Sequence, residues 1–129
     1  MTAVSRSREI AWSGEERLAS VRYTAGTTLK SADGDFLVDT LTGWIGDEGE
    51  PFAVLAEAAG LAGTDAEYRA KASAFFRRHR ENAFIALVNL GPVIHVVVEL
   101  FRVGTGNQLK TCASEADARA WLRTNGIAV

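Results

Sequence analysis

Ala83-Phe-Ile-Ala-Leu-Val-Asn-Leu90, together with the residues that follow it as far as Gly126, decides the fold. The run is continuously apolar and too short for a typical helix, which is the pattern of a strand covered on both faces of a parallel sheet. Gly91 ends this strand. Pro92 suits the first turn of a following helix, because its missing N–H is one that no helix would use and its φ is already helical. A strand followed by a helix is therefore predicted here.

The segment after Pro92 requires a choice between strand and helix. Val93-Ile-His-Val-Val-Val98 is β-branched and would be assigned to a strand by propensity alone. A strand here would follow another strand directly across Gly91 and Pro92, whereas its apolar residues also form a helical stripe. We therefore expect a helix over Pro92–Arg102.

The rest of this stretch repeats the alternation of strand and helix. Beyond the break at Gly104 and Gly106, Gln108–Ala113 is predicted to be a second short strand, and Ser114-Glu-Ala-Asp117 caps a final amphipathic helix. Parallel strands joined by crossover helices give an α/β domain of two or three layers. Upstream, similar signals predict a hairpin, a helix and a third buried strand, at Glu9–Trp12 with Arg17–Thr24, Ser31–Ile45 and Pro51–Ala56.

Composition limits the classes of function. A chain of 129 residues can bury the core of one domain without a disulfide or a metal. We place that domain at residues 9–126, after a flexible N-terminus at residues 1–8. The formal charge of −2 lacks the basic excess that nucleic-acid binding uses, and the single Cys112 excludes an internal disulfide and a cysteine-built metal site. Without a secretory signal or a run of about 18 apolar residues, we expect a cytoplasmic protein with no membrane span.

Another helix is predicted to begin at Thr64. Thr64-Asp-Ala-Glu67 fits a capping box, in which the threonine oxygen accepts from one backbone amide and the glutamate reaches back to another. The residues that follow form one apolar stripe at helical spacing, with a basic face opposite that we interpret as solvated. We therefore expect the apolar residues to be structural, namely Tyr68, Ala72, Phe75, Phe76 and His79.

No reaction can be deduced from the residues. A hydrolase or transferase needs a nucleophile beside a base, or carboxylates in different environments, and neither pattern occurs. His79 and His95 lie within apolar patterns and are interpreted as packed side chains. Gly60 and Gly63 lie between a strand and a helix, yet they match neither the Walker pattern nor the dinucleotide pattern. We expect a protein that is not an enzyme, with no metal and no cofactor.

Four segments carry a resemblance to a known family. They are the hairpin end Val21-Arg-Tyr-Thr-Ala-Gly26, the loop Gly60-Leu-Ala-Gly-Thr-Asp65, the break Leu90-Gly-Pro92 and the closing helix Ser114–Leu122. In order and pattern the chain resembles the STAS domain of bacterial anti-sigma-factor antagonists and sulphate transporter tails, and most of all the small free-standing STAS-like proteins. The resemblance implies a STAS-like sheet with an N-terminal hairpin, and a bacterial regulatory module that binds a protein partner.

The resemblance also implies a site of modification. In anti-sigma-factor antagonists a serine or threonine at the start of the helix after the third strand is phosphorylated, and Thr64 holds that place here. The family's usual pattern has an aspartate before the phosphoacceptor and a glycine shortly after it. This chain departs from that pattern, because Gly63 precedes Thr64, and Ala66 and Glu67 follow it. Thr64 is therefore either a phosphoacceptor or a helix cap only.

Three hypotheses follow from the chain. The first is a protein-binding module, using the loop surface of Gly60, Gly63, Asp65 and Glu67 and an apolar helix face that pairs with a partner, most simply in a homodimer. The second is a small-molecule or lipid-binding domain that uses the 92–102 helix, and the third is an enzyme whose site is not visible. A pocket of several hundred cubic ångströms lined by apolar side chains would favour the second hypothesis, and an exposed apolar patch with no pocket would favour the first. The expected interface residues are Val93, Ile94, Val97, Leu100 and Phe101.

Overall fold

Six strands form one mixed sheet at the centre of the molecule. The computed structural model describes residues 1–129, and the strand order is β1-β2-β3-β5-β7-β8. The first three strands are antiparallel neighbours, and β3, β5, β7 and β8 run parallel, as predicted for strands joined by helices. The strands are Thr2–Val4 (β1), Arg8–Ser13 (β2), Leu18–Tyr23 (β3), Phe52–Glu57 (β5), Ala83–Val88 (β7) and Gln108–Cys112 (β8).

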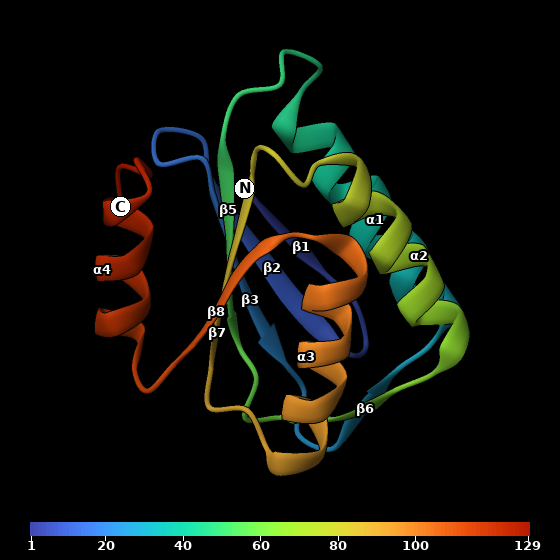
Figure 1. Ribbon diagram of the computed structural model, residues 1–129. Coiled ribbons are helices and arrows are strands. Elements are labelled where there is room, and N and C mark those ends of the chain that lie inside the picture. The colour runs from blue at the N-terminus through green and yellow to red at the C-terminus, as the bar shows by residue number, and fades with distance from the viewer.

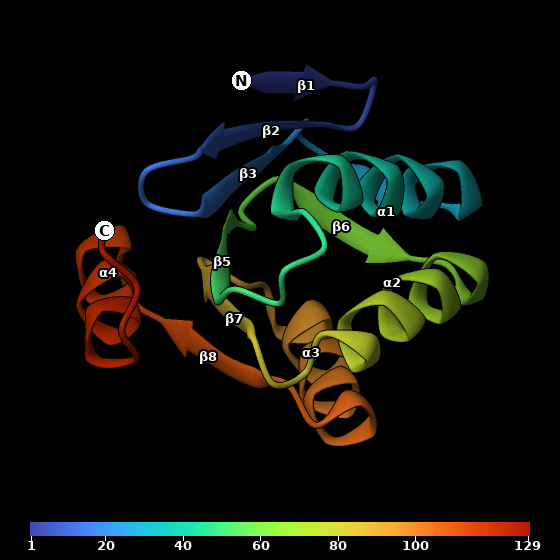
Figure 2. The same cartoon turned by 90° about the horizontal axis from the view of Figure 1, so that it is seen from above.

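Helices cover both faces of this sheet. Three of them lie on one face and the last lies alone on the other, so the fold has three layers (Figures 1 and 2). The prediction of an α/β domain is confirmed, and so is the choice of a helix after Pro92 despite its β-branched residues. The helices are Ser31–Ile45 (α1), Ala66–Arg78 (α2), Pro92–Thr105 (α3) and Glu115–Thr124 (α4).

The core is divided by the sheet into two clusters. The larger lies under α1 and α2 and includes Leu41, Phe75 and Phe76, while the smaller lies under α4 and includes Leu122. Phe75 and Phe76 are both buried, which confirms that the predicted stripe of α2 faces the core. By contrast, α3 packs against α2 and β6 (Leu61–Thr64), at the border of the larger cluster.

Two regions differ from the sequence prediction. Residues 1–8 were expected to lie outside the domain, whereas Thr2–Val4 pairs with β2 as an edge strand and Arg8 begins β2. The glycine-containing loop was expected to be irregular, whereas β6 pairs in parallel with Thr27–Leu29 (β4) in a small second sheet. β4 has three residues and β6 has four, so neither is long enough to show a strand pattern in the sequence. Their pairing with each other is what defines them as strands.

Candidate functional site

The predicted capping box at Thr64 does not form. Thr64 is the last residue of β6, and Asp65 is the N-cap of α2, where its side chain accepts a hydrogen bond of 2.8 Å from the amide of Tyr68. Asp65 is as good a cap as threonine, and pairing of β6 with Leu29 keeps Thr64 extended. The helix therefore begins one residue later than predicted.

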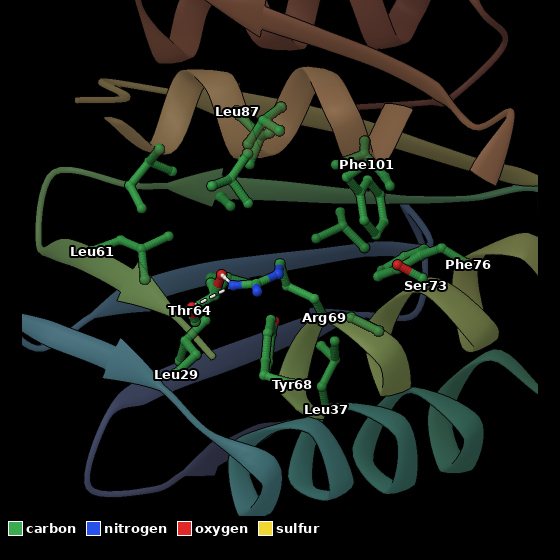
Figure 3. Close-up of a pocket in the computed structure, with 18 of the residues that line it drawn as sticks. Leu29, Leu37, Leu61, Thr64, Tyr68, Arg69, Ser73, Phe76, Leu87 and Phe101 are labelled. Atoms are coloured by element: carbon green, nitrogen blue, oxygen red, sulfur yellow. Dashed lines mark hydrogen bonds between the residues drawn. The ribbon is translucent and has the colours of Figure 1, made fainter. Parts of the chain in front are cut away.

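Thr64 nevertheless has a defined polar partner. The Arg69 guanidinium donates to the Thr64 carbonyl at 2.6 Å and to its hydroxyl at 3.1 Å, one helical turn away (Figure 3). Sequence analysis had assigned the basic residues of α2 to a solvated face. Arg69 is exposed, but it reaches back to β6 and joins the polar rim of the site described next.

Gly60 is needed for a close approach of two backbones. A Cβ at this position would lie 2.6 Å from the carbonyl oxygen of Tyr23, well inside van der Waals contact. Gly63 has no such constraint, because its nearest neighbour would be the Thr28 side chain at 3.6 Å. Of the four predicted loop residues, Gly60 and Asp65 thus build the loop and the helix start, while the side chain of Glu67 is exposed to solvent.

An apolar cavity of about 520 Å³ lies beneath α3. Its walls come from α2, α3, β6 and the parallel strands, and Figure 3 shows Leu61, Leu87, Phe101 and Phe76 around one space. Eighteen of its 22 lining residues are hydrophobic, and its volume falls within the usual range of about 300–1,000 Å³ for ligand pockets. The structure therefore contains the pocket that the second sequence hypothesis requires.

The helix α3 presents different sets of residues to the inside and to the outside. Ile94 is only 4% exposed, and Val97 and Phe101 are half-buried, and all three line the cavity. These three were expected at a partner interface, but they turn inward because α2 and the sheet lie on that side. On the outer side of α3, the large apolar residues that are 59–74% exposed are Val93 and Leu100, which belong to the expected interface set, with Val96 and Val103, which do not.

A charged side chain also lines the cavity. Arg8 is 2% exposed, and its guanidinium donates to the Tyr68 hydroxyl at 3.2 Å and to the carbonyl of Asp33. Arg8 is absent from the predicted site, because the prediction placed residues 1–8 in a flexible N-terminus. The signal was present, since Arg8, Ile10 and Trp12 alternate with less buried residues and share one face of β2.

The side chains present can bind but do not form a visible catalytic set. His79 meets Phe75 edge-on, with ring centroids 4.7 Å apart, and burial, reinforced by the charge of Arg78, lowers the pKa of the imidazole. His95 is exposed on α3, away from the cavity lining. No group of three His, Cys, Asp or Glu residues is placed to hold a metal ion, and no helix has the length and apolar character to span a membrane.

Comparisons with known proteins give the fold but no closer relative. No protein family model matches the chain, and no curated protein matches it. Among solved structures, an uncharacterised DUF3478-family protein with a SpoIIAA-like fold from Shewanella loihica PV-4 has a TM-score of 0.64 at 14% identity, over 95% of this chain and 90% of that chain.

Two further structures are similar over most of this chain. The anti-sigma factor antagonist SpoIIAA in its unphosphorylated form has a TM-score of 0.61 at 13% identity, over 91% of this chain and 98% of that chain. The murine anion transporter Slc26a9 in its inward-facing state has a TM-score of 0.61 at 16% identity, over 84% of this chain but 18% of the transporter. The chain thus has a STAS-like fold, as its resemblance in sequence implied.

Proposed function

We propose that this protein is a regulatory module without catalysis that acts by binding another protein through the outer face of α3. The observation that carries the proposal is the row of exposed apolar residues on that face, which we call the outer row: Val93, Val96, Leu100 and Val103. Contiguous apolar surface of this kind marks interaction sites on proteins that are otherwise polar outside.

The spacing of the outer row indicates what kind of surface fits it. Its members are separated by three, four and three residues, which is the repeat of the seam through which one helix packs on another. The neighbouring Glu99 and Arg102 form an ion pair with each other at 3.0 Å, so the border of the row carries no unpaired charge at this point. A helix face of this kind can pack against an identical face of another helix. We therefore infer that the simplest partner is α3 of a second copy.

Sedimentation of the full chain at micromolar concentration tests this proposal. We expect a dimer for the wild type and a monomer for the double variant Val96→Lys/Val103→Lys, because each lysine would have to be buried in the seam. His95→Lys is the matched control, since it adds the same group to the exposed polar side of the same helix. A wild type that stays monomeric, or a double variant that dimerises as well, would contradict the proposal.

Control by phosphorylation at Thr64 is a separate proposal. A phosphate there would lie beside Arg69, which favours it, and beside Asp65 and Glu67, which oppose it. Incubation with lysate kinases, followed by mass spectrometry of the wild type and of Thr64→Val, tests for the modification. If the wild type carries no phosphate at Thr64, the proposal of phosphorylation fails, and the role of Thr64 is limited to the structure of β6.

The cavity favours a second candidate function, the binding of an apolar small molecule. It lies on the inner side of α3, so the two proposals use largely different residues of one helix, and Leu100 is the one member of the outer row that also borders the cavity. The apolar lining is the supporting observation, because pockets of this size that are lined mainly by apolar side chains bind small apolar molecules.

A further inference from the structure

The lining of the cavity is divided into a polar and an apolar side. All four residues that are not hydrophobic come from β2, β6 and α2, namely Arg8, Thr64, Arg69 and Ser73. Every lining residue contributed by α3, β5, β7 and β8 is apolar. A ligand that matches this lining has an apolar body and a polar group at one end.

Arg8 determines the charge of that polar group. It is the one charged lining residue that is fully buried, and no carboxylate lies within 4 Å of its guanidinium. Its Nε atom is buried and has no hydrogen-bond partner. A guanidinium remains charged under all ordinary conditions, so this position holds a buried positive charge that is in direct contact with no carboxylate, although the more distant charge of Asp33 stabilises it in part.

The surroundings of Arg8 offset its burial only in part. The rings of Tyr68 and Phe36 lie 5.5 and 5.8 Å from the guanidinium carbon, at distances that favour cation–π attraction. The carbonyl of Asp33 and the hydroxyl of Tyr68 accept its hydrogen bonds, but both are neutral. An anion in the cavity would add the missing opposite charge, and charge-assisted hydrogen bonds of this type are about twice as strong as neutral ones.

Two tyrosine hydroxyls provide further contacts for such an anion. Tyr23 and Tyr68 both line the cavity, on the same side as Arg8. Burial raises the pKa of Tyr23, so its hydroxyl stays protonated and can donate a hydrogen bond. At the rim, the exposed Arg69 adds a second cation that attracts anions toward the opening.

We infer that the cavity binds an anionic amphiphile, of which a medium-chain fatty acid is the simplest, with its carboxylate against Arg8 and its chain along the apolar side under α3. This inference rests on the second candidate function above, because it names the ligand class of that cavity. It does not require self-association through the outer row, although Leu100 borders both surfaces.

Calorimetric titration of the full chain with decanoate, decan-1-ol and decylamine, each below its micelle concentration, tests the inference. We expect decanoate to bind one molecule per chain, at least about tenfold more tightly than the alcohol, and the amine to bind most weakly. If neither decanoate nor the alcohol binds, the ligand-binding function itself fails. If all three bind equally, that function stands and the anionic ligand class is wrong.

Variants locate the binding and assign the charge. Ser73→Phe places a ring in the cavity and should weaken decanoate and decanol alike by at least about tenfold, and unchanged affinities would place the binding elsewhere. Arg8→Met should remove the preference for decanoate over decanol, whereas Arg78→Met on the exposed side of α2 should leave it intact. A preference that persists in folded Arg8→Met overturns the role of Arg8. Should Arg8→Met not fold, the ranking of the three ligands and Ser73→Phe decide the inference.

Discussion

The neighbouring helices α2 and α3 lie on the same face of the sheet, but they use their apolar residues differently. The polar helix α2 has few apolar residues, and it buries Ala72, Phe75 and Phe76 in the larger core cluster. The more apolar α3 buries only Ile94 and Thr105 completely. Where α2 meets the core closely, α3 lies over the cavity and exposes its outer row.

This difference separates residues that stabilise the fold from residues that are available for binding. A domain gains stability from apolar side chains that are removed from water, and most of those on α3 are not fully removed by the chain itself. The apolar residues of α3 therefore need another explanation, and the cavity and the outer row each supply one. Five measurements, in order of decreasing expected effect, test the comparison.

The largest effect is expected in α2, from Phe75→Ala. The ring is buried in the larger cluster and meets Phe76 edge-on, with centroids 5.1 Å apart. Its removal should lower the free energy of unfolding by about 3–5 kcal/mol, measured by denaturant titration. Leu100→Ala, at an exposed position of α3, is the control and should cost far less. An unchanged midpoint for Phe75→Ala would show that this stripe does not stabilise the core.

A smaller loss is expected for the equivalent change in α3, Ile94→Ala. Ile94 is buried, but it lines the cavity, so one side of its side chain faces space and not protein. We expect a cost of about 2 kcal/mol, the lower end of the range for such truncations. A cost equal to that of Phe75→Ala in the same titration would show that α3 is packed as tightly as α2, and the comparison would fail.

The start of α2 provides the third test. Asp65→Ala removes the side chain that caps the amide of Tyr68 and should cost about 1 kcal/mol. Thr64→Ala, the matched control one residue earlier, should cost less, because its hydroxyl contacts only the exposed Arg69. The reverse order of the two effects would restore Thr64 as the cap that sequence analysis predicted.

The sequence predicted the elements whose patterns are local and repeated. Ala83–Leu90 and the helix after Pro92 were identified because strand length, glycine breaks and the position of proline act within a few residues. The pairing of β4 with β6 was missed because each strand is too short to show a period, and the pair joins segments more than 30 residues apart. A hydrophobic site beneath the 92–102 helix was one of the hypotheses from the sequence, but the size of the cavity could not be predicted, because it depends on how far α3 stands from the sheet. The burial of Arg8 could have been predicted, since Arg8 continues the alternation of buried and less buried residues along β2.

The outer row should contribute little to the stability of the single chain. Val96→Ser and Val103→Ser alter exposed side chains, so at a concentration where the protein sediments as a monomer each should change the free energy of unfolding by less than about 0.5 kcal/mol. The same variants should weaken self-association. A large loss of stability in the monomer would mean that the row packs within the chain and is not free to bind.

The smallest expected effect is a dependence of stability on pH from His79, at the C-cap of α2. Its ring contacts Phe52 and Phe75 edge-on, with ring centroids 5.9 and 4.7 Å away, and burial together with the charge of Arg78 lowers its pKa below the usual value of about 6.5 for histidine. The unfolded chain therefore takes up a proton at higher pH than the folded chain does. As pH falls through about 6.5 the folded state should lose stability, and the loss should level off below the lowered pKa.

Melting temperatures of the wild type and of His79→Gln, followed from about pH 7.5 to about pH 5, should differ in slope over this window. Equal slopes would show that His79 is not packed in the folded state. The close packing that distinguishes α2 from α3 would then be limited to its buried phenylalanines.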